Sequence, residues 1–208
     1  MNARNSLRLE MAKLEDNSDN ALTLAQLHKE VLERLRAAHI GDAELSARRI
    51  LEETTGVDVG QFPAEESHLM NQRMVARTDA LTARRAAGEP LQYVIGSWDF
   101  RYLDLAVDRR ALIPRPETEE VVGRAVEILT SKGQSLGEKA LIADLGTGTG
   151  AIALSIAQEV PDAHLHATDI SDEALSLARS NLAGLGRAAA RVQLHEGDWL
   201  NALPEGLK

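Results

Sequence analysis

The chain has 208 residues, of which 44% are hydrophobic and 26% are charged, and its formal net charge is −9. This balance is typical of a globular protein, and the acidic excess argues against a general nucleic-acid surface, because neutralising phosphates requires clustered Lys and Arg. The absence of cysteine excludes disulfides, thiolate metal sites and cysteine nucleophiles. No segment has the apolar core of a signal peptide or reaches membrane-spanning length. We therefore expect a cytoplasmic enzyme or binding protein with no membrane partner and no direct nucleic-acid partner.

The first part of the sequence predicts a tail followed by helices. Residues 1–20 show no periodicity that could be buried, so we expect a flexible tail. A helical domain follows over residues 21–88. Its first helix is expected to begin at Thr23, where Thr23 and Gln26 have the spacing of a capping box and leucines recur at helical intervals. Asp42 is expected to cap the second helix.

The second helix is expected to end at Gly56, since glycine readily takes up the left-handed conformation that ends helices. A third is predicted from about Ala64 to Ala87, with Leu69, Met74 and Leu81 on its apolar face. We interpret the region as a small helical bundle.

Four arginines near the end of this bundle form a stripe at helical spacing. They are Arg73, Arg77, Arg84 and Arg85. The stripe could meet RNA or an acidic partner, or it could be a solvated helix surface.

The spacing of hydrophobic residues changes twice in the rest of the chain. Residues 89–113 shift toward a period of two and predict a β-hairpin that links the bundle to the C-terminal domain. In that domain, residues 114–208, Pro116 suits the first turn of a helix, and buried strands then alternate with helices. This alternation predicts an α/β fold with three parallel strands, in which ligands bind at the carboxyl ends of the strands.

The segment "DLGTGTGAIA" places Gly146, Gly148 and Gly150 between a predicted strand and a predicted helix. In that setting glycine lets a ligand approach the backbone closely. A tight turn without a ligand remains open. A dinucleotide site also remains open, because Gly148 to Ala153 satisfies the G-x-G-x-x-A pattern.

Asp144 places a carboxylate beside this loop, and no Lys or Arg lies between Asp144 and Ser155. A pyrophosphate would meet like-charge repulsion there, whereas a cationic ligand would be favoured. S-adenosyl-L-methionine meets this requirement, since it carries a sulfonium and an ammonium group and no phosphate. We predict that it is the cofactor and that Thr147 and Thr149 line its site together with the glycines.

The next two predicted strands end in groups that suit the remainder of this cofactor. Asp169 ends the second strand, where a carboxylate suits hydrogen bonds to both ribose hydroxyls, although it could instead cap the following helix. Asp198 and Trp199 end the third strand and offer an acceptor and an aromatic face for adenine. Trp199 could alternatively be a core residue.

Three histidines, His164, His166 and His195, are expected on neighbouring strands. No carboxylate or cysteine completes a convincing set of ligands. We therefore predict no metal site and interpret these histidines as surface or core residues.

With these residues placed, the chain resembles the HemK/PrmC family of peptide chain release factor N5-glutamine methyltransferases from about Leu22 onward. The segments that carry the resemblance are "GEPLQYVIGSWDF" (88–100), "LIPRPETE" (112–119), "DLGTGTGAIALSIA" (144–157) and "GDW" (197–199). The resemblance implies the Rossmann-like sheet of class I methyltransferases. It also implies methyl transfer from S-adenosyl-L-methionine to the glutamine side-chain amide in the Gly-Gly-Gln loop of a release factor.

The resemblance further implies a role for each part of the site. Gly146 to Gly150 would line the methionine part of the cofactor, Asp169 would bind ribose and Trp199 would lie beside adenine. The helical domain and the hairpin would help to hold the release factor.

The catalytic Asn-Pro-Pro-Tyr motif of the family is absent from this sequence, so no catalytic residue is assigned. We expect the chain to be a fragment that stops before the fourth strand, leaves "LIADLG" as a sheet edge and does not transfer a methyl group by itself. Two other functions stay open. One is a nucleic-acid adenine methyltransferase, and the other is a non-catalytic module that binds a release factor or the cofactor.

Overall fold

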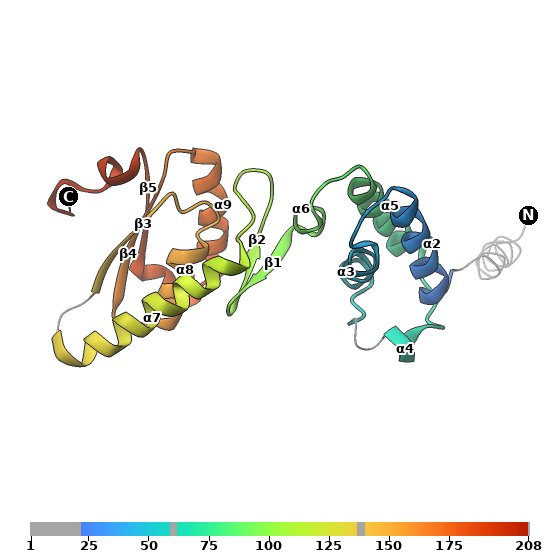
Figure 1. Ribbon diagram of the computed structural model, residues 1–208, viewed down its shortest axis with the longest axis horizontal. Helices are drawn as coiled ribbons and strands as arrows, with labels where there is room; N and C mark the ends of the chain where they lie inside the picture. The colour runs from blue at the N-terminus through green and yellow to red at the C-terminus, as the bar shows by residue number, and fades with distance from the viewer. Residues whose placement is uncertain (1–21, 59–61, 137–139, 208) are drawn as a thin grey trace, which may run out of the picture. The chain divides into compact units, whose positions relative to one another are not determined.

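The computed structural model describes residues 22–58, 62–136 and 140–207. The chain divides into two compact units, Met1–Ile95 and Gly96–Lys208 (Figure 1). The flexible tail predicted for residues 1–20 lies outside the described residues. Within the described ranges, no helix combines the length and the apolar character needed to cross a lipid bilayer.

The first unit consists of helices packed around a leucine-rich core. Its helices are α2 Leu24–Ala37, α3 Ala43–Thr55, α4 Phe62–Glu65, α5 Gln72–Ala86 and α6 Leu91–Ile95. The buried face of α2 carries three leucines and a valine at helical spacing, and α3 contributes Ile50 and Leu51. The predicted helical bundle is therefore confirmed.

The first two helices start differently. Thr23 and Gln26 form the predicted capping box, in which N of Thr23 lies 2.8 Å from Oε1 of Gln26 and N of Gln26 lies 3.2 Å from Oγ1 of Thr23. Helix α3 begins after Asp42 as predicted, but the Asp42 carboxylate makes no capping bond. Its Oδ1 accepts a hydrogen bond from Nη2 of Arg85 at 2.5 Å instead. A charged donor competes better for a carboxylate than a neutral backbone N–H does.

The single helix predicted over residues 64–87 is wrong, because the segment contains two helices. Helix α5 begins only after Asn71, whose Oδ1 accepts a hydrogen bond from N of Met74 at 2.9 Å. Just before it, N of Met70 donates to O of Leu22 at 2.8 Å. Pairing with the residues that precede α2 therefore interrupts the helical pattern, which sequence periodicity does not reveal.

The predicted pair of strands is present, but it starts later than Leu91. Residues 91–95 form helix α6, whose carbonyl groups at Tyr93 and Val94 accept hydrogen bonds from Arg84 at 2.7 and 3.2 Å. Strand β1 Ser97–Phe100 then pairs antiparallel with β2 Leu103–Ala106. These hydrogen bonds from Arg84 hold the end of the helical turn that precedes the hairpin.

The second unit contains a parallel sheet in the order β3-β4-β5. Its strands are β3 Ala140–Leu145, β4 Ala163–Asp169 and β5 Val192–Glu196. Its α-helices are α7 Pro116–Leu136, α8 Ala151–Glu159 and α9 Asp172–Ala183. Short 3-10 helices follow at η2 Gly186–Arg191, η3 Trp199–Ala202 and η4 Glu205–Leu207. The predicted α/β class, with a helical bundle and three parallel strands of a Rossmann-like sheet, is confirmed. In the described part of the chain, β3 pairs with β4 alone and forms a sheet edge.

One apolar core joins the helices of this unit to one face of the sheet. Among its buried members are Phe100 of β1, Val122 of α7, Leu154 of α8 and Leu165 of β4. Arg101, in the turn between β1 and β2, fastens the hairpin to this core. Its Nε and Nη2 each donate to one carboxylate oxygen of Glu159 at 2.6 Å, and its Nη1 donates to O of Glu119 at 3.0 Å. The hairpin is therefore held within the second unit.

We expect Glu159→Gln to lower the free energy of unfolding by about 1.5–3 kcal/mol, because it weakens a largely buried hydrogen-bonded ion pair. The Arg101 and Glu159 side chains are 17% and 13% exposed. Glu127→Gln is a matched control, since Glu127 pairs with Arg124 on α7 where both side chains are more than 60% exposed. Such a surface pair contributes less than about 1 kcal/mol. Urea unfolding measures both variants, and equal effects would contradict this assignment.

Candidate functional site

The candidate site is the loop between β3 and α8. Gly146, Gly148 and Gly150 adopt φ angles of +78°, +57° and +86°, which side-chain-bearing residues rarely adopt. A methyl group added at Gly146 would meet no atom within 4 Å, whereas one at Gly150 would lie 2.9 Å from Cδ1 of Leu154. Gly146 is therefore required for backbone shape and has open space beside it. Gly150 is required both for shape and for close packing on α8.

Four backbone N–H groups of the loop donate hydrogen bonds within the protein. N of Gly146 and N of Thr147 donate to O of Thr168 at 2.9 and 2.8 Å, and N of Gly150 donates to O of Thr147 at 2.9 Å. N of Gly148 donates to Oδ2 of Asp169 at 2.9 Å. A loop that binds a pyrophosphate needs such N–H groups for the ligand. Their internal use disfavours the dinucleotide interpretation.

Asp144 lies beneath this loop and is buried. Its Oδ2 accepts hydrogen bonds from Oγ1 of Thr147 at 2.6 Å and from N of Ala153 at 3.2 Å. Burial raises the pKa of Asp144, the two hydrogen bonds oppose that shift, and the charge of Asp169 adds to it. Asp144 thus holds the loop through hydrogen bonds. Any effect of Asp144 on a bound ligand is exerted through the charge of its carboxylate. The side chains of Thr147 and Thr149 are buried as well.

Asp169 occupies the centre of the arrangement, at the carboxyl end of β4. The cap of α9 is Ser171, whose Oγ accepts a hydrogen bond from N of Ala174 at 3.2 Å. The alternative in which Asp169 merely caps this helix is therefore wrong. Asp169 accepts one hydrogen bond at each carboxylate oxygen, from N of Gly148 at 2.9 Å and from N of Ser171 at 3.0 Å. Each oxygen of a carboxylate has a second lone pair, so both retain acceptor capacity.

The turn after β5 adds an aromatic side chain to the same end of the sheet. Trp199 is 66% exposed and has a φ angle of +47°, so the alternative in which it is a core residue is wrong. Asp198 is exposed as well. N of Gly197 donates to O of Asp169 at 2.9 Å, which ties this turn to the end of β4. Ile170, which follows Asp169, is also exposed.

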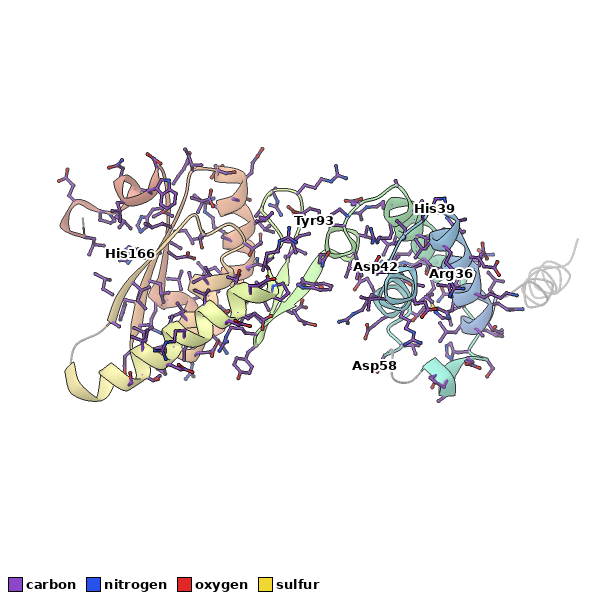
Figure 2. The ribbon with its side chains drawn as sticks, viewed as in Figure 1. Arg36, His39, Asp42, Asp58, Tyr93 and His166 are labelled. Atoms are coloured by element: carbon purple, nitrogen blue, oxygen red, sulfur yellow. The ribbon has the colours of Figure 1, made fainter. Side chains whose placement is uncertain are left out.

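The three histidines lie on β4 and β5, and two of them meet. His166 of β4 is labelled in Figure 2. Its Nδ1 lies 2.8 Å from Nε2 of His195, and the two rings stack with centroids 5.1 Å apart. Burial lowers the pKa of His166, and the charges of His195 and His164 add to that effect. Within the described ranges, no group of three or more His, Cys, Asp or Glu side chains is arranged to hold a metal ion.

Comparison with known proteins agrees with both units. A model of the PrmC N-terminal domain matches residues 26–96, and a model of a methyltransferase domain matches residues 142–206. A release factor glutamine methyltransferase of Moorella thermoacetica is 40% identical over 187 residues, which cover 90% of this chain and 64% of that relative. The chain is similar to the release factor glutamine methyltransferases over most of its length. The resemblance inferred from the sequence is thereby confirmed.

Two further relatives of the same name are similar to this chain. The release factor glutamine methyltransferase of Streptomyces coelicolor is 45% identical over 130 residues, covering 62% of this chain and 43% of that relative. That of Deinococcus radiodurans is 38% identical over 182 residues, covering 88% and 63% respectively. The chain spans between 43% and 64% of the length of these three relatives.

Three of the four arginines in the predicted stripe form ion pairs inside the first unit. The pairs are Arg77 with Glu53, Arg84 with Glu89 and Arg85 with Asp42. Arg85 also donates to Oγ of Ser46 at 3.0 Å. These contacts connect α5 to α3 and to the residues that precede α6. They favour a helix surface paired within the unit over an RNA-binding stripe.

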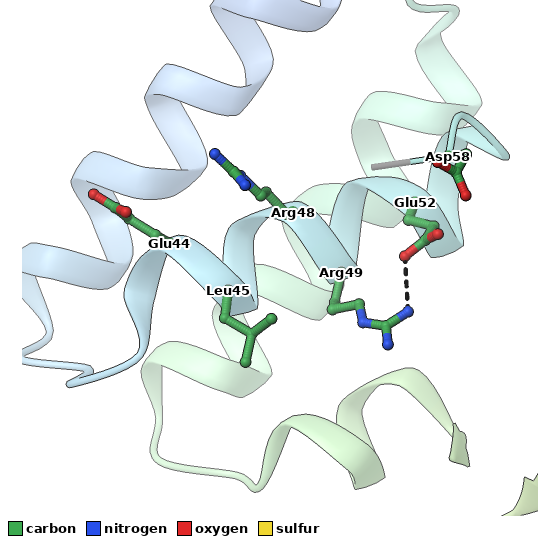
Figure 3. Close-up of a pocket in the computed structure, with 6 residues that line it drawn as sticks. All are labelled: Glu44, Leu45, Arg48, Arg49, Glu52 and Asp58. Atoms are coloured by element: carbon green, nitrogen blue, oxygen red, sulfur yellow. Dashed lines mark hydrogen bonds and ion pairs between the residues drawn. The ribbon is translucent and has the colours of Figure 1, made fainter. Parts of the chain in front are cut away.

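The same unit has a cavity of about 610 Å³ on α3 (Figure 3). Its lining residues are Glu44, Leu45, Arg48, Arg49, Glu52 and Asp58. Nη1 of Arg49 lies 3.0 Å from Oε2 of Glu52, so opposite charges are partly paired within it. The cavity includes none of the predicted cofactor-binding residues, all of which lie in the second unit.

Asn181, a residue of α9 whose side chain contacts the glycine loop, is not among the site residues predicted from the sequence. Its Nδ2 donates to O of Thr149 at 2.9 Å. A signal was present, because Asn181 continues the helical spacing of the buried residues Ala174, Leu177 and Ala178. A polar residue on a buried helix face generally has a specific hydrogen-bond partner.

We expect Gly146→Ala to destabilise the second unit by about 1–2 kcal/mol through left-handed backbone strain alone. Gly150→Ala should add about 1–3 kcal/mol for overpacking against Leu154. Gly41→Ala is the control, because Gly41 has no positive φ and an added methyl group meets no atom within 4 Å. Thermal and urea unfolding measure the stabilities of the three variants, which should fall in the order Gly41→Ala, Gly146→Ala, Gly150→Ala. A Gly150→Ala variant as stable as Gly41→Ala would contradict the loop geometry.

Proposed function

We propose that this chain supplies the cofactor-binding part of a methyltransferase that acts on peptide chain release factors. The methyl donor is S-adenosyl-L-methionine, and the acceptor is the side-chain amide nitrogen (N5) of the glutamine in the Gly-Gly-Gln motif. The observation that carries the proposal is the position of Asp169. Its carboxylate retains acceptor capacity where the glycine loop, the start of α9 and the turn after β5 meet.

The residues around Asp169 fit each part of this donor. Gly146 has open space beside it, which suits the methionine part. The free lone pairs of Asp169 suit the two ribose hydroxyls, and the exposed side chains of Ile170 and Trp199 offer apolar surface for adenine. Asp198, exposed beside Trp199, is available as an acceptor for a donor group of adenine.

The electrostatics of the loop favour a cation over a phosphate. When bound, S-adenosyl-L-methionine supplies a methyl group on a positively charged sulfur. The Asp144 carboxylate beneath the loop attracts such a charge, and no Lys or Arg lies between Asp144 and Ser155 to offset it. Four of the loop N–H groups donate within the protein and are therefore not available to a diphosphate.

The release factor substrate is supported by the names of the relatives and by the PrmC N-terminal domain that the chain carries. The sequence contains no Asn-Pro-Pro-Tyr motif, so the residues assigned to the site all belong to the donor side of the reaction. A cytoplasmic location follows from this substrate, because release factors act on the ribosome.

We expect Asp169→Asn to weaken binding of S-adenosylhomocysteine about tenfold or more, since hydrogen bonds to a charged group contribute about 1.5–3 kcal/mol. Asp162→Asn is the control, because Asp162 is exposed at the opposite end of β4 and should bind as the wild type does. Isothermal titration measures both. Binding of NAD in place of S-adenosylhomocysteine would contradict the proposal. A chain that binds no peptide chain release factor would contradict the proposed substrate.

We expect Asp144→Asn to reduce the preference for S-adenosyl-L-methionine over S-adenosylhomocysteine by roughly fivefold, or about 1 kcal/mol, because only the former carries the sulfonium charge. Since burial raises the pKa of Asp144, this carboxylate takes up a proton at a higher pH than an exposed one. The wild-type preference should therefore fall as the pH is lowered through that pKa, while the variant shows no such change. Equal preference in both proteins at neutral pH would rule out a role for this charge.

A further inference from the structure

The side chain of Asn181 joins three segments that lie far apart in the sequence. Its Nδ2 donates to O of Thr149 in the glycine loop at 2.9 Å and to O of Ala106 at the end of β2 at 3.1 Å. Its Oδ1 accepts a hydrogen bond from N of Ala106 at 2.8 Å. Both amide donors and one acceptor position are therefore used, and all three partners are backbone groups.

The packing around this amide brings the hairpin and the loop together. Ala111 forms a buried cluster with Ala174 and Leu177 of α9, and Ala106 packs against it. A methyl group added at Gly148 would lie 3.9 Å from Cβ of Ala111, which places this cluster directly beside the loop. The apolar contact sets the distance between hairpin, loop and helix, and the amide sets their alignment.

An amide is the group that this arrangement requires. The two carbonyl oxygens need donors, and the N–H of Ala106 needs an acceptor, so a carboxylate of the same shape would face two carbonyl oxygens with like partial charge. A small apolar side chain would leave these backbone groups without their partner, which is costly in a part-buried setting. The glycine loop is sensitive to this loss. Its three glycines adopt left-handed backbone angles, and glycine can adopt many other conformations as readily.

We propose that Asn181 is a positioning residue that ties β2 to the glycine loop and holds the loop in the shape that receives the methyl donor. The inference rests on the proposed function of that loop. Thr149, whose carbonyl Asn181 holds, lies between Gly148, which bonds to Asp169, and Gly150, which starts α8. Asn181 thus acts on the cofactor through the loop, and it couples the hairpin to the cofactor site.

The experiment compares four forms of the chain by titration with S-adenosylhomocysteine and by amide hydrogen exchange without ligand. In Asn181→Asp, the dissociation constant should rise at least tenfold, and amide exchange at Ala106 and in residues 146–148 should become at least tenfold faster. Ser180→Ala is the matched control on α9, since Oγ of Ser180 bonds only to O of Ser176 in its own helix. Val122→Ala controls for lost stability, because this buried residue of α7 packs in the main core. Both controls should keep wild-type affinity and loop protection.

The outcomes separate the inference from the proposed function. If the wild-type chain binds and Asn181→Asp binds equally well with unchanged loop protection, the positioning role is wrong. If Val122→Ala loses as much affinity as Asn181→Asp at equal thermal stability, the effect of Asn181 is a general one and the inference also fails. If the wild type binds no S-adenosylhomocysteine, the proposed function fails, while faster loop exchange in the variant still establishes that Asn181 holds the loop. Should Asn181→Asp not fold, Asn181→Ala takes its place in the same measurements.

Discussion

The arrangement of the candidate site depends on one residue at the end of the central strand. The carboxylate of Asp169 accepts a hydrogen bond from the glycine loop at Gly148 and another from the start of α9 at Ser171. Its carbonyl oxygen accepts a third from Gly197, in the turn after β5. Parallel pairing brings these segments to one edge of the sheet, because all three strands end there. A single acidic residue therefore sets the positions of the three segments that surround it.

The groups that a ligand can contact at this site depend on which hydrogen-bond donors are already used within the protein. The N–H groups of Gly146, Thr147 and Gly148 are used within the protein, and Thr147 is itself held by the buried Asp144 carboxylate. The groups left exposed to a ligand are the acceptor capacity on Asp169 and the apolar surface of Trp199. We propose that this surface receives a ligand with hydroxyl groups, an aromatic base and positive charge rather than a diphosphate.

Local sequence signals predicted the elements well wherever each element depends on its own residues. The capping box at Thr23, the end of α3 at Gly56 and the alternation of strands with helices in the second unit are all present. The errors occur where distant residues decide. The segment before Asn71 pairs with the residues that precede α2, and the guanidinium group of Arg84 donates hydrogen bonds to two carbonyl groups of α6. Periodicity within a short window contains no information about such contacts.

The sequence by itself determined the fold class, the family resemblance and the position of the glycine loop, because these depend on local periodicity and on motifs that are contiguous in the chain. Only the tertiary structure decided how each site residue is used. In the folded chain, the buried Asp144 carboxylate accepts a hydrogen bond from the loop, and Trp199 is exposed. Asn181 of α9 contacts both the loop and the hairpin. The physical reason is that a polar side chain takes its role from its hydrogen-bond partners. For these residues most partners lie on other elements, which only folding brings within reach.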